Sequence, residues 1–255
     1  MARIVGIVNQ KGGTGKTTTS VNLAGYLAHL GRHVLLVDLD PQGNATSGLG
    51  VNQDELNHGL YQVMAGLKKP EETILRTRIS GYELLPATPD LAGAAVELVN
   101  EPEREFVLKK ALSRIRTSYD YILIDCPPSL GILTLNGLLA SEELIIPVQT
   151  EYYALEGLGQ LFKTVTLINE NLATDLKIKG ALLTMYDRRN RLSRQVAKEV
   201  QQHFPAPVFE AVIPRCVKLA EAPSHGKIIS EYHPRSKGAR AYKDLAEEII
   251  KMDLV

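Results

Sequence analysis

Residues 11–18 read Lys11-Gly12-Gly13-Thr14-Gly15-Lys16-Thr17-Thr18, and they join an apolar run (residues 3–8) to a stretch with helical spacing (residues 16–30). Glycines let a backbone turn tightly and aim successive N–H groups at phosphate oxygens. The start of a helix adds partial positive charge at the same place. The segment therefore predicts a phosphate-binding loop between a buried strand and a helix.

The polar side chains of this loop predict how a nucleoside triphosphate is held. Lys16 is placed to reach the β- and γ-phosphates, and the Thr17 hydroxyl is placed to bind Mg²⁺. Thr18 can donate to the α-phosphate. The general spacing of such loops puts a first glycine where this chain has Gln10, and the loop begins instead with a lysine, Lys11. The predicted cradle is completed by the backbone of Gly12, Gly13, Thr14 and Gly15.

Two further segments place carboxylates at the ends of predicted strands. Asp125 follows four apolar residues, and an acid in that position beside a phosphate loop helps to hold Mg²⁺, directly or through water. Asp38 and Asp40 follow another apolar run and lie two positions apart. On an extended backbone their side chains share one face. We expect one of the two to touch the metal's shell and the other to orient the attacking water.

Short apolar runs alternate with helix-length amphipathic stretches along the rest of the chain. The runs are apolar almost throughout, which is typical of parallel strands covered on both faces. This alternation predicts a single doubly wound α/β domain, residues 1–255, with a mostly parallel sheet and helices on both faces. Strands are predicted at residues 3–8, 33–37, 82–85, 121–124, 144–148, 178–184 and 208–212, a loop at 39–50, and helices at 16–30, 104–116, 133–140, 155–171, 193–203 and 237–251.

Composition narrows the class of protein. The chain has 255 residues, is 44% hydrophobic and 23% charged, and carries equal numbers of acidic and basic residues. An overall basic polyanion binder is therefore excluded, although a local basic face is not. Its two cysteines, Cys126 and Cys216, form no disulfide framework or metal-ligand spacing and are expected to be buried free thiols. No signal peptide and no stretch long enough to cross a bilayer is present, so we expect a soluble, cytoplasmic protein.

Three motifs together resemble the deviant Walker ATPases, which have the P-loop NTPase fold, and within them the ParA/Soj chromosome-partitioning proteins. The first is the lysine-first loop described above. The others are Asp38-Leu39-Asp40-Pro41-Gln42-Gly43-Asn44 and Asp125-Cys126-Pro127-Pro128-Ser129. Later segments are also similar to this family, and the resemblance covers nearly the whole chain: Pro147-Val148-Gln149-Thr150-Glu151-Tyr152-Tyr153-Ala154-Leu155-Glu156-Gly157, Val212-Ile213-Pro214-Arg215 and Glu221-Ala222-Pro223-Ser224-His225-Gly226.

The resemblance implies an ATPase that works as a homodimer with ATP sandwiched between two copies. Lys11 of each copy would reach the other copy's phosphates, as an arginine finger does, and Asp40 would activate or orient the water. Mg²⁺ would be held by Thr17 and Asp125. Adenine would lie near Tyr186-Asp187 and Pro214-Arg215. The catalytic residues implied in this way are Lys11, Lys16, Asp40 and Asp125.

The chain's charge is unevenly distributed. Residues 177–243 hold 14 lysines and arginines but 5 acids, and such a face binds nucleic-acid phosphates without sequence preference. The resemblance implies that the ATP-loaded dimer binds nonspecific double-stranded DNA on the nucleoid, through Arg189, Arg215 and Lys218. It also implies a ParB-type centromere-binding partner that stimulates hydrolysis, and a possible link to the replication initiator DnaA. No membrane binding is expected.

Three alternatives stay open at this point. A MinD-like positioning ATPase would bind membranes through a C-terminal amphipathic helix, whereas residues 239–251 carry a stripe typical of a core-facing helix. A metabolic enzyme such as dethiobiotin synthetase would use ATP to activate a small substrate, but Lys11 and the basic segment argue against it. A scaffold would bind the nucleotide without hydrolysing it.

Overall fold

The computed structural model describes residues 1–98, 102–152, 154–172 and 174–254. The described strands form one seven-stranded sheet in the order β3-β4-β2-β5-β1-β6-β7. Every neighbouring pair is parallel except β3 and β4. The strands are β1 (Arg3–Ile7), β2 (Val34–Asp38), β3 (Leu75–Arg76), β4 (Tyr82–Leu85), β5 (Tyr121–Asp125), β6 (Glu143–Gln149) and β7 (Lys177–Thr184).

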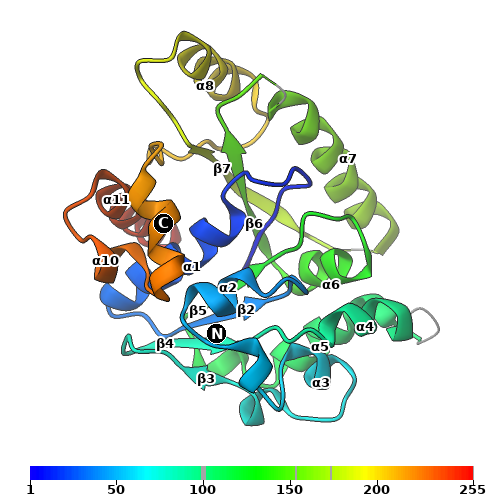
Figure 1. Cartoon of the computed structure of the whole chain (residues 1–255). Coiled ribbons are helices and arrows are strands. Elements are labelled where there is room, and N and C mark those ends of the chain that lie inside the picture. Colours follow the sequence, from blue (N-terminus) through cyan, green and yellow to red (C-terminus); the bar gives the residue numbers. More distant parts are fainter. Residues whose placement is uncertain (99–101, 153, 173, 255) are drawn as a thin grey trace.

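Helices cover both faces of this sheet, as Figure 1 shows. Successive residues of a strand face opposite sides; in β2, Leu35 and Val37 pack into one hydrophobic core, whereas Val34 and Leu36 pack into the other. The first core is closed by α3 (Leu60–Met64), α4 (Leu91–Glu97), α5 (Val107–Ser113), α6 (Ile132–Ala140), α7 (Ala154–Leu172) and α8 (Arg191–His203). The second is closed by α1 (Lys16–His29), α9 (Val217–Glu221), α10 (Ile229–Tyr232) and α11 (Lys237–Asp253). The fold is therefore the doubly wound α/β fold that the sequence predicts.

The connections contain short helical segments that the sequence analysis did not predict. The segment predicted as a loop over residues 39–50 contains α2 (Asn44–Gly48). The stretch 104–116, predicted as one helix, is divided into a 3₁₀ turn, α5 and a second 3₁₀ turn. Asn136 of α6 lies at the first of these two boundaries, where its amide donates to the Arg104 carbonyl and accepts from the Leu108 N–H. The 3₁₀ turns are η1 (Gln53–Glu55), η2 (Pro70–Glu72), η4 (Arg104–Phe106), η5 (Arg116–Ser118) and η6 (Ala222–His225).

The strand predicted at residues 208–212 is wrong. Val208 forms only an isolated bridge with Ala181 of β7, and the backbone N–H of Phe209 donates to the Ala181 carbonyl. The preceding Pro207 offers a carbonyl but has no N–H to donate. Beyond Phe209, the N–H groups of Glu210 and Ala211 donate to the Glu248 carboxylate of α11 at 2.8 and 3.0 Å instead of to β7, so the pairing does not extend into an eighth strand.

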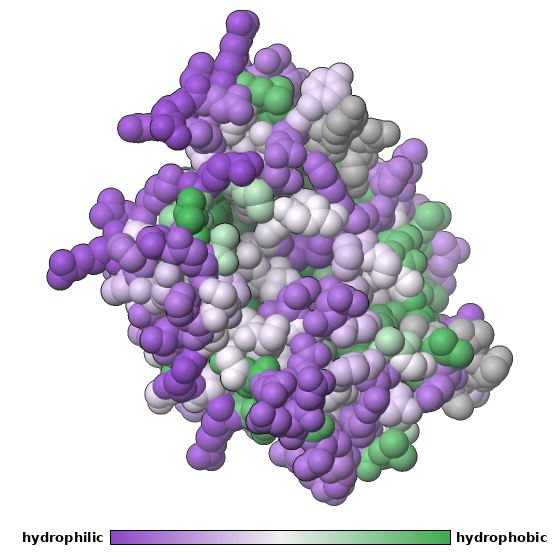
Figure 2. Space-filling view, in the orientation of Figure 1, coloured by the Kyte–Doolittle hydropathy of each residue, from purple (hydrophilic) through white to green (hydrophobic). Residues whose placement is uncertain are grey.

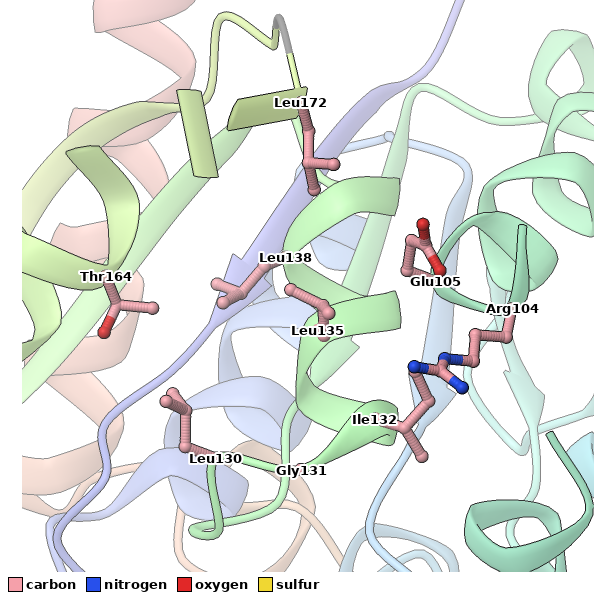
Figure 3. A pocket seen from close by; sticks show the side chains of 9 residues that line it. All are labelled: Arg104, Glu105, Leu130, Gly131, Ile132, Leu135, Leu138, Thr164 and Leu172. Atoms are coloured by element: carbon pink, nitrogen blue, oxygen red, sulfur yellow. The ribbon is translucent and has the colours of Figure 1, made fainter. Parts of the chain in front are cut away.

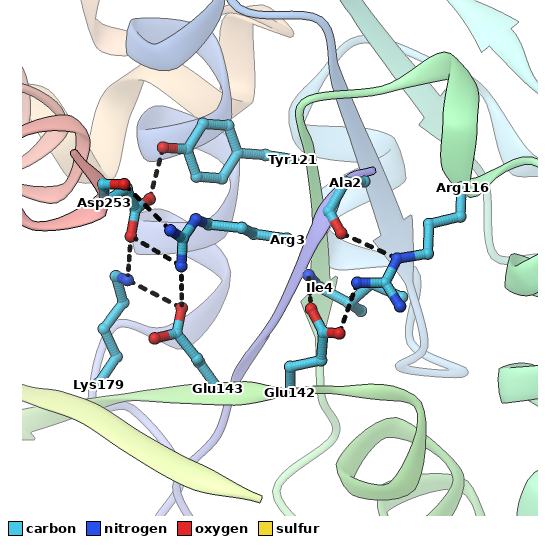
Figure 4. Close-up of polar contacts among 9 residues, drawn as sticks. All are labelled: Ala2, Arg3, Ile4, Arg116, Tyr121, Glu142, Glu143, Lys179 and Asp253. Carbon is cyan, nitrogen blue, oxygen red and sulfur yellow. Dashed lines mark hydrogen bonds and ion pairs between the residues drawn. The ribbon is translucent and has the colours of Figure 1, made fainter. Parts of the chain in front are cut away.

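A buried ion cluster at the amino-terminal edge of the sheet holds the end of α11 (Figure 4). The Lys179 ammonium lies 2.6 Å from Asp253 Oδ1 and 2.8 Å from Glu143 Oε2. The Tyr121 hydroxyl donates to Asp253 Oδ2 at 2.6 Å, and Arg3 lies 3.3 Å from the same carboxylate. The side chain of Lys179 is 3% exposed and that of Asp253 is 8% exposed. These contacts tie the C-terminal helix directly to β1, β5 and β7 and, through Lys179, to β6.

Candidate nucleotide-binding site

The opposite, carboxyl-terminal edge of the sheet brings the three candidate motifs together. β1, β2 and β5 are neighbours there, and Asp125 stands opposite both Asp38 and Ile7 in the strand register. The chain leaves β1 directly into the glycine-rich loop and then α1. In open α/β sheets, ligands bind at this edge, where the strand order reverses.

The loop adopts the backbone geometry that its glycines permit. Gly13 has φ 74° and Gly15 has φ 89°, a left-handed conformation that strains other residues. Gly15 precedes the first turn of α1, where no side chain caps the free N–H groups. The Thr184 hydroxyl, at the end of β7, donates to the Thr14 carbonyl at 2.8 Å and fixes the loop. The free N–H groups at the start of α1 can therefore donate to an anion.

Lys16 is the cation inside this loop. Its side chain is buried, and its ammonium donates to the Lys11 carbonyl at 3.1 Å. Burial lowers the pKa of Lys16, while the nearby Asp125 and Asp40 carboxylates act in the opposite direction. An ammonium held against the loop's own carbonyl can exchange that oxygen for a phosphate oxygen.

The two acids that follow β2 have different partners. Asp38 is fully buried and accepts hydrogen bonds from the Thr46 N–H at 2.8 Å and the Thr46 hydroxyl at 2.7 Å. Its other oxygen accepts from the Asp40 N–H at 3.3 Å. Asp40 accepts from the Gln42 N–H at 3.0 Å and lines the open hollow in front of the phosphate loop. Asp38 therefore anchors α2, whereas Asp40 faces the space where a nucleotide's phosphates would lie.

Asp125 fits a magnesium site. One of its oxygens accepts from the Ser20 hydroxyl at 2.8 Å, but the other, Oδ2, is buried without a hydrogen-bond partner among the described residues. Buried carboxylate oxygens are rarely left unpartnered. Thr17 lines the adjoining hollow, and carboxylate and hydroxyl oxygens are the ligands that Mg²⁺ prefers. Thr17 and Asp125 could therefore hold this ion.

Two hollows adjoin each other beside the loop. The first, of about 460 Å³, is lined by Gly12, Gly13, Gly15, Lys16, Thr17, Thr18, Asp40, Asn44, Ser47, Gly48, Pro128, Met185 and Pro223. The second, of about 390 Å³, shares Gly15, Thr18 and Met185 with it and is lined by Pro214, Arg215, Cys216 and Tyr242 among others. Its mostly apolar lining suits a flat nucleobase next to a phosphate site. Tyr186 and Asp187, expected near adenine, do not line it.

Met185, which no sequence motif indicated, lines both hollows. It has φ 52°, which is uncommon for a residue other than glycine. The backbone bonds of Tyr186 to Ile213 and of Arg215 to Tyr186 hold this conformation in place. In the sequence, only its position directly after the apolar run that forms β7 could have indicated that Met185 lies at the site. Cys126 is buried, as expected, but Cys216 is only half-buried because it borders the second hollow.

A larger hollow lies apart from this site. It measures about 490 Å³ and is lined by residues of η4, α6 and α7, and Figure 3 shows Leu138 pointing toward the Thr164 side and Ile132 toward Arg104. None of its lining residues belongs to the phosphate loop or to the acid-bearing motifs. Its size therefore does not make it the site of phosphate chemistry.

The three residues expected to contact DNA each lie beside a carboxylate. Arg189 lies 3.3 Å from Asp187 and is 86% exposed. Arg215 lies 3.7 Å from Glu151, and Lys218 lies 2.7 Å from Glu221. All three side chains reach solvent, so the structure leaves them accessible to a polyanion.

Burial makes the stability of the empty protein depend on pH. Burial, followed by repulsion from Asp38, raises the pKa of Asp125 to about 7, whereas a carboxyl in an unfolded chain titrates near 3.9. The folded state therefore binds the proton more tightly, and this contribution to stability is lost as pH rises from about 4 to 7. We expect Asp125→Asn to be more stable than wild type at pH 8, by on the order of 1 kcal/mol or more, and the difference to shrink toward pH 5.

Urea unfolding of wild type and Asp125→Asn without nucleotide checks this expectation. The matched control is Asp175→Asn, because Asp175 is 86% exposed and lies far from the loop, beside Lys177. A stability difference between wild type and Asp125→Asn that does not change with pH would contradict the assignment.

Comparison with known proteins finds a matching family model and relatives of similar length. A family model described as "AAA domain" matches residues 2–178. The sporulation initiation inhibitor protein Soj of Bacillus subtilis is 54% identical over 249 residues, 98% of each chain. The chromosome partitioning protein ParA of Myxococcus xanthus is 51% identical over 253 residues, 99% of this chain and 89% of that one.

Solved structures share the fold and contain nucleotide with magnesium. A cobyrinic acid a,c-diamide synthase from Mycobacterium smegmatis with a bound ATP analogue and magnesium has TM-score 0.88 and 40% identity, covering 100% of this chain and 96% of that chain. The septum site-determining protein MinD of Pyrococcus horikoshii, complexed with Mg-ADP, has TM-score 0.81 and 31% identity, covering 99% of this chain and 98% of that chain. No helix in the described ranges is long and apolar enough to cross a bilayer.

Proposed function

Because the chain belongs to the Soj/ParA family of chromosome-partitioning ATPases, we propose that it is a DNA-bound segregation switch controlled by ATP. It is an ATPase that uses ATP with Mg²⁺. In the proposed cycle, two copies pair face to face on ATP and bind DNA without sequence preference. A ParB-type partner then stimulates hydrolysis and releases the pair.

The position of Lys11 carries the proposal. Lys16 lines the phosphate hollow of its own copy, but Lys11 does not. The Lys11 side chain is 35% exposed, and its ammonium lies 3.7 Å from Glu151. A cation at the mouth of the loop, outside its own hollow, can serve the phosphates of a second copy. Such a cation stabilises the charge that develops during phosphoryl transfer.

The other site residues have separate roles in this proposal. Lys16 and the loop N–H groups, from Gly12 to Thr18, hold the phosphates. Mg²⁺, held through Thr17 and Asp125, neutralises phosphate charge when it is bound. Asp40 orients the attacking water, and Pro214 and Arg215 border the nucleobase.

The basic segment of the chain, residues 177–243, supports DNA as the ligand of the pair. It holds 14 lysines and arginines against 5 acids. Figure 2 shows hydrophilic side chains projecting over the α8 region and the α10–α11 region. Each copy contributes half of the contact surface, so pairing doubles the number of phosphates neutralised. Because each neutralised phosphate releases counterions, the affinity of the pair for DNA should rise steeply.

The C-terminal helix argues against a membrane as the docking surface. In α11, Tyr242, Leu245 and Ile249 are buried in the core formed with α1. Asp253 is held by the ion cluster at the far end of the same helix. A MinD-like membrane helix would have to present its apolar face to lipid, and here that face is occupied.

The proposed partners follow from family membership. A ParB-type centromere-binding protein would supply the stimulus for hydrolysis through a basic tail, and the replication initiator DnaA is a further proposed partner. Nucleoid association would follow from DNA binding. If the protein instead amidated a small acid, as the named activity of one structural relative suggests, DNA retention would not depend on ATP.

DNA retention measured with ATP, with ADP and without nucleotide tests this function. We expect retention with ATP to exceed, many-fold, the weak retention with ADP or without nucleotide, and expect Arg215→Glu or Lys218→Glu to weaken it. Because each copy loses a phosphate contact, the slope of log DNA affinity against log salt concentration should become smaller in magnitude by about 1 per contact removed. Lys177→Glu is the matched control, since Lys177 is 66% exposed but begins β7 at the opposite edge of the sheet. Equal retention in all three nucleotide states would overturn the proposal.

A further inference from the structure

We propose that Glu151 is a positioning residue that holds both Lys11 and Arg215 within one copy and so opposes pairing and DNA binding before ATP arrives. This inference rests on the proposed function. It concerns the loop that follows β6, to which the mechanism above gives no role.

One carboxylate faces two functional cations. Glu151 Oε2 lies 3.7 Å from the Lys11 ammonium, and Glu151 Oε1 lies 3.7 Å from the Arg215 guanidinium. The Gln149 amide donates to Oε1 at 2.6 Å and orients the carboxylate. Glu151 thus joins three loops that follow different strands: the phosphate loop after β1, the loop after β6, and the segment beside β7 that contains Arg215.

The backbone of each loop is anchored, so the side chains can separate without a rearrangement of the fold. The buried Asn9 amide donates to the Pro147 carbonyl at 2.8 Å, and its oxygen accepts from the Lys11 N–H at 2.9 Å. The Arg215 N–H donates to the Tyr186 carbonyl at 3.0 Å. The side chains of Lys11, Glu151 and Arg215 are 35%, 48% and 62% exposed.

The exposure of these contacts limits their strength. Exposed ion pairs contribute little free energy, so loss of either contact should change the equilibrium constant for pairing or for DNA binding by about fivefold at most. Contacts of this strength hold the two side chains in the nucleotide-free copy. A bound γ-phosphate can still break them, because charge-assisted hydrogen bonds to phosphate are stronger. Glu151 also offsets positive charge beside the proposed DNA surface until pairing occurs.

The test compares Glu151→Gln with Glu247→Gln. Glu247 is 52% exposed and lies 3.5 Å from Lys243, so its replacement also removes one negative charge and frees one cation in the basic segment. We expect Glu151→Gln, and not the control, to pair with ATP at up to about fivefold lower protein concentration. Nucleotide-free DNA retention should rise by a similar factor, and urea unfolding midpoints should stay equal.

The same substitution made in Arg215→Gln protein tests whether Glu151 affects DNA retention through Arg215. In Arg215→Gln protein, the further change Glu151→Gln should no longer raise nucleotide-free DNA retention. The proposal is overturned if Glu151→Gln matches Glu247→Gln in both assays, or if it weakens pairing. Should wild type fail to pair on ATP, the proposed function is wrong, while the nucleotide-free DNA assay still decides the role of Glu151.

Discussion

Lys11→Ala is expected to lower ATP turnover at saturating ATP by about 10³-fold or more, while each copy still binds ATP. A cation that completes the site from the other copy contributes about 10³ to 10⁵ in rate, whereas in the proposed site Lys16 and the loop N–H groups of the same copy would hold ATP. Phosphate release measures turnover, and a fluorescent ATP analogue measures binding. Lys198→Ala, on the helix α8, is the matched lysine control.

Mixing two inactive variants separates a role across copies from a role within one. A mixed pair of Lys11→Ala and Asp40→Ala copies has one site with both Asp40 and the other copy's Lys11. Random mixing of equal amounts should then restore about a quarter of wild-type turnover, because half of the pairs are mixed and each has one complete site. If Lys11 acts on its own copy's nucleotide, no mixing ratio restores turnover.

Lys179→Met is expected to lower the free energy of unfolding by about 3 to 5 kcal/mol, the usual cost of removing one partner from a buried ion pair. The Lys179 ammonium is the closest cation to both Asp253 and Glu143. Without it, Arg3 remains beside them, but at 3.3 Å and 4.0 Å rather than 2.6 Å and 2.8 Å. Urea unfolding measures the loss.

Two controls accompany this measurement. Lys177→Met removes an exposed lysine from the same strand and should cost less than about 0.5 kcal/mol. The double variant Lys179→Met with Asp253→Asn should recover part of the loss, because it leaves one fewer uncompensated charge. A loss for Lys179→Met as small as that for Lys177→Met would mean that the cluster does not hold α11.

The parts of the molecule that local sequence encodes were predicted well. The runs that became β1, β2 and β5 are apolar almost throughout, which is typical of strands buried on both faces. The phosphate loop was predicted in its strand–loop–helix context, because Gly13 and Gly15 supply backbone angles that few other residues allow. Asp125 was placed at the correct edge, since it directly follows an apolar run.

Features that depend on distant partners were not predicted. Lys179 interrupts an apolar strand, and its partners lie 36 and 74 residues away in the sequence. The pattern around Asp38 and Asp40 indicated one shared face, but Thr46 draws Asp38 inward, and that contact exists only because residues 44–48 form a helix. Glu151 was part of a recognised motif, yet its two cations belong to loops after other strands.

Light scattering of Asp40→Ala with ATP, with ADP and without nucleotide tests the central claim most directly. Loss of this carboxylate should slow hydrolysis and trap the loaded pair. The account predicts about twice the single-copy mass of 28.0 kDa with ATP and the single-copy mass with ADP or without nucleotide. A mass of 28.0 kDa at saturating ATP and Mg²⁺, with nucleotide bound, would contradict it.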